Sequence, residues 1–200
     1  MKPIVDIDRR IVQCSVCGYQ QAHRFSPLFI ITGPSGAGKT AIVPALQQLL
    51  PTWEVFETDI LWDSGSDWGM VKCNWLRIAQ HIAQRPRGNP TILCGTILPD
   101  QIADCPSLPL FSAIYWLALL CEHATLADRL RRRPAWRGWD EAKIAEHLQF
   151  ADWFRSHGHD AFDPPLTMID TTHASIEETT NVIRDWALAR WNSGEYPEAH

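Results

Sequence analysis

The chain has 200 residues, a length that suits a single α/β domain with a substantial core. Its hydrophobic fraction of 46%, charged fraction of 20% and net charge of −5 are those of an ordinary globular protein and argue against a nucleic-acid partner. The longest apolar run, residues 114–121, is too short to cross a bilayer, and the N-terminus lacks a signal-peptide core. We therefore expect a cytoplasmic protein with no membrane partner.

Residues 1–27 are expected to form a small extension that is separate from the main domain of residues 28–200. Within the extension, residues 4–7 and 11–14 have the composition of short strands. This pattern predicts either a β-hairpin or an addition to the edge of a larger sheet. The sequence leaves the purpose of the extension open.

The six cysteines include one CxxC pair, Cys14 and Cys17. This pair is half of a zinc-binding motif, and His23 is a conceivable third ligand, but no second CxxC completes the site. Cys94 and Cys121 lie in apolar runs that are typical of buried residues. We expect all six to be reduced, inert thiols.

From residue 28 onward, segments with strand-like and helix-like patterns alternate. The expected strands are residues 28–32, 53–57, 90–95, 111–119 and 165–169. This alternation predicts a three-layer α/β/α fold with a five-stranded, mostly parallel sheet. Ligands of such sheets bind at the carboxyl ends of the strands, so the residues after each strand are the candidate site residues.

A Gly-rich stretch directly follows the first of these strands and precedes a segment with helical spacing. It reads Gly33, Pro34, Ser35, Gly36, Ala37, Gly38, Lys39 and Thr40. A strand, a Gly-rich turn and a helix in this order are typical of a phosphate-binding P-loop, in which backbone N–H groups and the helix N-terminus face an anion. We predict that it binds a nucleoside triphosphate, with Lys39 on the β- and γ-phosphates and the Thr40 hydroxyl on Mg²⁺. The sequence does not distinguish ATP from GTP.

Candidate acceptor-site residues follow the second and third strands. Asp59 is placed to take a proton from an attacking hydroxyl or to hold Mg²⁺ through water, with Glu57 less suited and Asp63 in reserve. Trp62 is a candidate contact for a flat or apolar acceptor. After the third strand, Gly95 allows close approach of a substrate and Thr96 offers a hydroxyl, although a simple turn explains both equally well.

An arginine-rich segment follows the fourth strand, where residues 122–133 are expected to form a helix. Its arginines are Arg129, Arg131, Arg132, Arg133 and Arg137. Residues 133–140 contain Pro134 and Gly138 and predict a short mobile lid that closes on phosphates. Arg133 and Arg137 are the candidate transition-state clamps. A basic patch that only balances acidic neighbours is the alternative.

Thr171 and Thr172, after the fifth strand, are candidates for holding the nucleotide base. They serve equally well as the lead-in to a helix, because Ser175 and Glu178 have the spacing of a capping box.

The order of these pieces resembles the small-molecule and nucleotide kinases of the P-loop superfamily, such as shikimate, gluconate and adenylate kinases and chloramphenicol phosphotransferase. The resemblance covers residues 28–191. Taken whole, the chain is most similar to uncharacterised bacterial nucleoside kinase-like or AAA-family ATPase proteins. The resemblance implies that Arg129 stacks on adenine, that Arg133 reaches the phosphates and that Asp59 is the catalytic carboxylate.

Together, these features predict an ATP- and Mg²⁺-dependent transfer of the γ-phosphate to a hydroxyl of a small molecule, nucleoside-like or antibiotic-like. An ATP-binding regulatory module, or a slow NTPase without a small-molecule acceptor, is the alternative. The extra N-terminal segment favours this alternative, as does the absence of the arginine pair that nucleoside monophosphate kinases use on the acceptor phosphate. The oligomeric state cannot be inferred.

Overall fold

The structure, a computed structural model, describes residues 2–63, 65–86 and 88–193. Five parallel strands form a central sheet in the order β5-β6-β4-β7-β8. The strands are β4 (Leu28–Thr32), β5 (Glu54–Glu57), β6 (Thr91–Cys94), β7 (Ile114–Leu120) and β8 (Thr167–Asp170). The strands of the predicted parallel sheet are therefore present.

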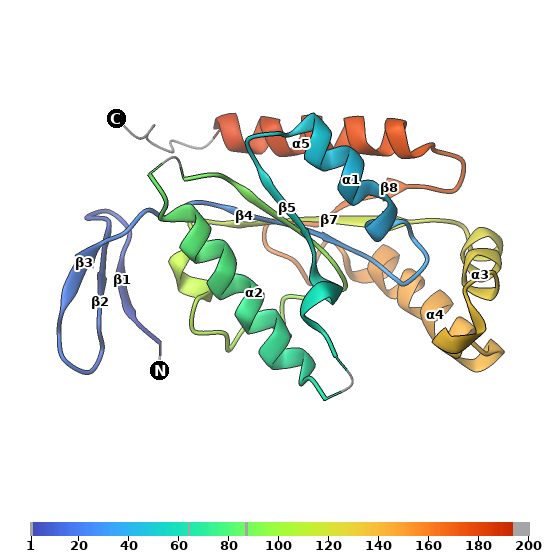
Figure 1. Cartoon of the computed structure of the whole chain (residues 1–200), viewed down its shortest axis with the longest axis horizontal. Coiled ribbons are helices and arrows are strands. Elements are labelled where there is room, and N and C mark those ends of the chain that lie inside the picture. The colour runs from blue at the N-terminus through green and yellow to red at the C-terminus, as the bar shows by residue number, and fades with distance from the viewer. Residues whose placement is uncertain (1, 64, 87, 194–200) are drawn as a thin grey trace.

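Helices cover both faces of this sheet. They are α1 (Lys39–Leu49), α2 (Trp68–Ala83), α3 (His123–Arg131), α4 (Glu141–His157) and α5 (Ile176–Ser193). Figure 1 shows α1 and α5 above the sheet, α2 and α4 below it, and α3 at one end. The predicted three-layer α/β/α architecture is confirmed.

Strand β4 is apolar on both sides because it lies at the centre of these layers. Leu28 and Ile30 belong to the core under α2 and α4, which includes Trp75. Phe29 and Ile31 belong to the core on the α1 and α5 side. Alternate residues of a strand point to opposite faces, so a strand buried on both faces forms a continuous apolar run.

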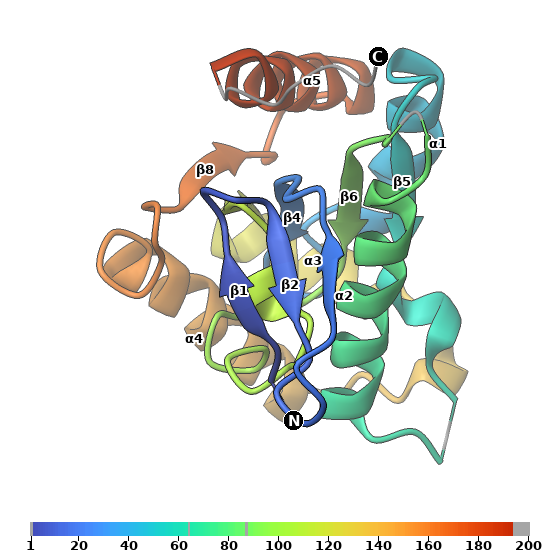
Figure 2. The same ribbon diagram turned by 90° about the vertical axis from the view of Figure 1, so that its left-hand side faces the viewer.

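The N-terminal residues form a second sheet of three antiparallel strands, in the order β1-β2-β3. These strands are β1 (Ile4–Asp6), β2 (Ile11–Gln13) and β3 (Gln20–Ala22). Figure 2 shows this sheet standing in front of the main sheet. The two short strands expected here are present, but they do not extend the main sheet, and β3 was not expected.

Several predicted element boundaries differ from those in the structure, and two of them bear on the site and its surroundings. The fourth strand of the main sheet begins at Ile114 rather than at residue 111. Helix α3 ends at Arg131, two residues before the expected end. Pro134 disfavours a helical backbone at the residue before it, so Arg133 lies outside the helix. Arg129 and Arg133 therefore do not share a helix face.

The expectation of six reduced thiols is also wrong, because Cys73 and Cys105 form a disulfide. Cys73 lies on α2 and Cys105 lies in the segment that follows β6, 32 residues later. Both residues pack in the core under α2. No motif spacing marks this pair, because the fold alone brings the two segments together. Cys14, Cys17, Cys94 and Cys121 are free.

No helix in the described part of the chain has both the length and the apolar character that crossing a membrane requires.

Candidate active site

The Gly-rich loop lies between β4 and α1 with a backbone that depends on its glycines. Gly33 has a φ of +130°, and a Cβ added to it would lie 2.4 Å from the Leu119 carbonyl oxygen. Gly38 has a φ of +108° and caps α1. L-residues rarely adopt such angles, so these positions require glycine. The loop therefore takes the form of a phosphate-binding turn at a helix N-terminus.

The Lys39 ammonium folds back over this loop. Its Nζ donates hydrogen bonds to the carbonyl oxygens of Gly33 at 2.7 Å and Pro34 at 2.8 Å. Burial lowers the pKa of Lys39 from 10.5 to about 8, the nearby Asp59 carboxylate opposes this decrease, and the Arg133 charge adds to it. Lys39 is therefore a cation held close to both Asp59 and Arg133.

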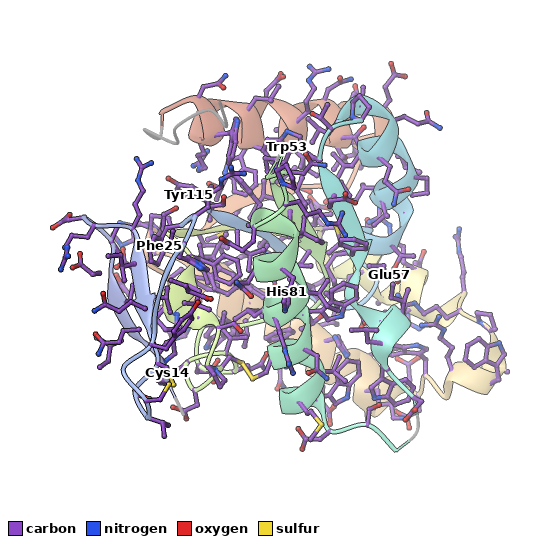
Figure 3. The ribbon with its side chains drawn as sticks, turned by 60° about the vertical axis from the view of Figure 1, so that its left-hand side comes forward. Cys14, Phe25, Trp53, Glu57, His81 and Tyr115 are labelled. Carbon is purple, nitrogen blue, oxygen red and sulfur yellow. A yellow bond between two sulfur atoms is a disulfide. The ribbon has the colours of Figure 1, made fainter. Side chains whose placement is uncertain are left out.

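Two carboxylates follow each other at the end of β5. Glu57, which is labelled in Figure 3, is the last residue of the strand. It accepts a hydrogen bond from the Thr40 hydroxyl at 2.5 Å. Asp59 lies two residues further on, in the 3-10 segment η1 (Thr58–Leu61). The Thr40 hydroxyl and the Glu57 carboxylate are oxygen groups of the kind that Mg²⁺ prefers, and few protein oxygens are needed because phosphate oxygens and water complete its shell. These residues therefore fit a magnesium ion.

The residues after β6 pack against the loop and against η1. A Cβ on Gly95 would lie 1.7 Å from the Thr58 hydroxyl oxygen, so this glycine is required by Thr58 itself. The Thr96 hydroxyl donates to the Gly33 carbonyl at 3.0 Å. Gly95 and Thr96 thus join the end of β6 to both the P-loop and the carboxylate segment.

The arginines of the basic cluster divide into two groups. Arg131 pairs with Glu141 through two hydrogen bonds of 2.8 and 2.7 Å, and Arg132 lies 3.8 Å from Asp128. For these two arginines the prediction of a patch that balances acidic neighbours is the better description. Arg133 and Arg137 instead lie over tryptophan rings.

The tryptophans beneath these two arginines lie in residues 133–140. Arg133 lies 5.2 Å from the ring centre of Trp139, and Arg137 lies 4.9 Å from that of Trp136. Such stacking holds a guanidinium in place while leaving its N–H edge free to bind anions. Trp136 and Arg137 belong to the 3-10 segment η3 (Ala135–Arg137).

Arg129 connects α3 to the segment after β8. It donates to the Thr171 carbonyl at 2.7 Å and to the Thr171 hydroxyl at 3.2 Å. That hydroxyl oxygen lies 3.0 Å from the carbonyl oxygen of Ala37 in the P-loop. Thr172, by contrast, accepts a hydrogen bond from the Glu122 N–H and bonds the Asp170 carboxylate. Its hydroxyl is therefore engaged on the protein.

One pocket of about 840 Å³ brings most of the candidate residues together. The predicted residues that line it are Ser35, Gly36, Ala37, Gly38, Lys39, Thr40, Asp59, Trp62, Gly95, Thr96, Arg129, Arg133, Arg137 and Thr171. Gly33, Pro34 and Thr172 are not among its lining residues. Gly33 and Pro34 direct their carbonyl groups at Lys39 instead.

Three residues at this site were not among the predicted site residues. Glu57 was only the less suited candidate base, but it bonds Thr40 and lines the pocket. Ile176, at the start of α5, lines the pocket and is 52% exposed. His147 of α4 accepts a hydrogen bond from the Ser35 N–H at 3.3 Å. Burial, together with the charges of Lys39 and Arg133, lowers the pKa of His147, so the ring is a neutral acceptor here.

Comparison with solved structures finds the same fold in several kinases. A protein from Chloroflexus aurantiacus, provisionally described as a kinase, has a TM-score of 0.57 at 20% identity, over 86% of this chain and 98% of that one. A sugar kinase from Janibacter sp. HTCC2649 has a TM-score of 0.56 at 15% identity, over 84% and 97%. A gluconokinase from Sinorhizobium meliloti has a TM-score of 0.53 at 17% identity, over 86% and 100%.

Comparisons of the sequence itself give no match, either to a family model or to a curated protein. At these identities the structural similarity shows the fold alone. The chain has the fold of the P-loop kinases.

Proposed function

We propose that this protein is an ATP- and Mg²⁺-dependent phosphotransferase that moves the γ-phosphate to a hydroxyl of a small molecule. One observation carries the proposal: a single pocket contains a P-loop, a carboxylate after β5 and two arginines from the lid segment. A P-loop alone supports nucleotide binding. The carboxylate and the arginines add a group that can take a proton and groups that can neutralise a transferring phosphoryl.

The nucleotide is placed by the P-loop and by Arg129. The triphosphate lies along the loop amides, with the γ-phosphate toward Lys39. The Arg129 guanidinium, fixed by Thr171, offers a planar surface for the base, and Ile176 and Thr179 line the same pocket.

The transfer itself needs few protein groups. Asp59 accepts the proton of the acceptor hydroxyl as its oxygen attacks the γ-phosphorus, and the bond from that phosphorus to the β,γ-bridging oxygen breaks to release ADP. Lys39, Arg133 and Arg137 neutralise charge on the phosphoryl oxygens. Thr40, with Glu57 next to it, would hold Mg²⁺, which supplies further charge neutralisation when bound.

The acceptor that fits this pocket is uncharged and partly flat. Among the described residues that line the pocket, the cationic side chains are Lys39, Arg129, Arg133 and Arg137. Each already has a role toward the nucleotide or the transferring group, so none is left for an anionic acceptor. Trp62, which stacks on Trp68 at 5.4 Å, and Trp136 present aromatic surfaces instead. A nucleoside-like or antibiotic-like alcohol satisfies both conditions.

The test measures ADP release from the full chain with ATP, Mg²⁺ and a panel of acceptors: nucleosides, nucleoside monophosphates, planar alcohols and sugar acids. We expect a neutral alcohol to accelerate release strongly and to appear phosphorylated by mass spectrometry. Lys39→Ala should abolish this turnover. Lys72→Ala should not, because Lys72 bonds Gln101 and does not line the pocket. Acceleration only by an anionic acceptor would contradict the acceptor class, and a response to macromolecules alone would favour a regulatory module.

A further inference from the structure

His147 of α4 contacts the P-loop, and the proposed reaction gives it no role. Its Nδ1 accepts a hydrogen bond from the Ser35 N–H at 3.3 Å. His147 does not line the pocket, so it contacts the loop from outside the pocket. The N–H groups of a P-loop bind the anion only when the backbone holds them in the right direction. His147 therefore fixes the direction of one amide of this loop.

The same imidazole also contacts the segment that follows α3. Its ring centre lies 4.9 Å from that of Trp139, at an interplanar angle of 63° that is typical of an edge-to-face contact. The Arg133 guanidinium lies over the Trp139 ring, 5.2 Å from its centre. Contacts in series therefore join Ser35 of the P-loop to Arg133, with His147 and Trp139 between them.

Helix α4 gives His147 a fixed support. Asp140 caps the N-terminus of the helix by accepting a hydrogen bond of 2.8 Å from a backbone N–H in the first turn. Further along, Ile144 and Phe154 are buried in the hydrophobic core. A side chain on a capped and packed helix is held more precisely than one on a loop. His147 is thus suited to position the less regular segments on either side of it.

The hydrogen bond requires a neutral imidazole. A backbone N–H can only donate, so Nδ1 has to be unprotonated and the ring proton has to lie on Nε2. Burial and the charges of Lys39 and Arg133 lower the pKa of His147, and the Glu146 carboxylate opposes this decrease. The surroundings of the ring therefore favour the form that can accept the hydrogen bond.

We propose that His147 is a positioning residue for phosphoryl transfer: its Nδ1 sets the Ser35 amide, and its ring sets Arg133 through Trp139. The inference rests on the proposed function, in which Arg133 acts on the transferring phosphoryl group. The two contacts use different parts of the imidazole, so they can be removed separately. Loss of the acceptor should weaken ATP binding, and loss of the ring should slow transfer from bound ATP.

Two substitutions make this separation. His147→Phe keeps a ring against Trp139 and removes the acceptor, whereas His147→Asn keeps a short acceptor and removes the ring. Calorimetry with ATP and Mg²⁺ gives the dissociation constant. Rapid quenching gives the single-turnover rate of ADP formation, with the best acceptor of the panel above or with water if none accelerates it.

The two variants should give opposite results. We expect His147→Phe to raise the ATP dissociation constant about tenfold, because the Ser35 N–H loses its partner, and to change the rate less than about threefold. We expect His147→Asn to lower the rate about tenfold, because Trp139 no longer holds Arg133 in place, and to change the dissociation constant less than about threefold.

Two further variants test the route and the specificity of these effects. Combined with Arg133→Ala, His147→Asn should cause no further loss of rate, since both changes remove the same group from the reaction. His157→Asn is the matched control on the same helix. His157 Nδ1 lies 3.1 Å from the Trp153 carbonyl oxygen, and His157 does not line the pocket, so both quantities should stay unchanged.

Nuclear magnetic resonance of the wild type tests the hydrogen bond without any activity. The ring nitrogen signals of His147, identified as those that either variant lacks, should show the neutral Nε2–H form at neutral pH. Thermal unfolding checks that both variants are folded, and the position of the ring proton decides the Ser35 contact if one is not.

Four outcomes would overturn the proposal: a proton on Nδ1, similar losses of affinity and rate in both variants, no loss in either, or additive losses with Arg133→Ala. A wild-type chain that binds ATP but forms no ADP would instead contradict the proposed function, and with it the role of Arg133. The two dissociation constants would then still decide the Ser35 contact.

Discussion

The position of the Lys39 ammonium predicts an unusual pH dependence of stability. Burial lowers the pKa of Lys39 to about 8 in the folded chain, from 10.5 without the fold. A cation whose pKa is lowered by folding destabilises the fold below pH 8, where it is charged in both states. This cost declines as the pH rises from 8 to 10.5, because the folded chain has then released its proton while the unfolded chain still holds it.

The magnitude follows from this decrease in pKa. A shift of one unit is worth about 1.4 kcal/mol, so the full cost at neutral pH is roughly 3 kcal/mol before any allowance for the partly open pocket. Between pH 7 and pH 9 the titration of Lys39 should raise the free energy of unfolding by about 1 kcal/mol. The Lys39→Met variant has no charge to bury, so its free energy of unfolding should not show this increase.

The assay is urea unfolding of the wild-type chain and Lys39→Met in parallel at pH 7 and pH 9. Titrating groups that do not interact with Lys39 cancel in the difference between the two chains. We expect the wild type to gain about 1 kcal/mol more than the variant over this interval. ATP binding to the wild type should weaken roughly tenfold over the same interval, because the ammonium is mostly neutral at pH 9. Equal changes in unfolding free energy for both chains would refute the assignment of a buried, titrating Lys39.

Two further predictions concern the groups around the transferring phosphate. Asp59→Asn should lower the rate of phosphoryl transfer by roughly a hundredfold or more, with little change in the ATP dissociation constant measured by calorimetry, since only proton removal is lost. An unchanged rate would exclude Asp59 as the base. Gly95→Ala should destabilise the chain by about 1–3 kcal/mol in urea unfolding, because its Cβ meets the Thr58 hydroxyl at 1.7 Å. Gly65→Ala, with its nearest contact at 3.6 Å, is the matched control and should unfold at nearly the same urea concentration.

The sequence predicted the parts of the fold that depend on local pattern. The P-loop was found because eight consecutive residues carry it, and β4 because a strand buried on both faces must be apolar throughout. Strand β3 was missed for the opposite reason, since Gln20, Gln21 and Ala22 are exposed and show no apolar alternation.

The contacts that were missed join residues distant in sequence. The Ser35–His147 hydrogen bond spans 112 residues, and the Cys73–Cys105 disulfide follows no motif. The basic cluster could be recognised from the sequence. The sequence could not show which of its arginines bind acidic neighbours such as Glu141 and which line the pocket, because this depends on where α3 ends. Asp59, Arg133 and Arg137 were placed near the P-loop from their positions after strands, and the structure brings all three into one pocket. Their chemical roles remain proposals.

The bonds that run from Arg129 through Thr171 to Ala37 have a mechanical consequence. They join Arg129, which would face the base, to the P-loop, which would face the phosphates. We therefore expect these two parts of the pocket to move together. We expect closure over a ligand to be confined to the chain beyond α3, where Pro134 and Gly138 flank the short 3-10 segment η3. A nucleotide would therefore contact the P-loop and Arg129 first. It would contact Arg133 and Arg137, which lie over Trp139 and Trp136, afterwards.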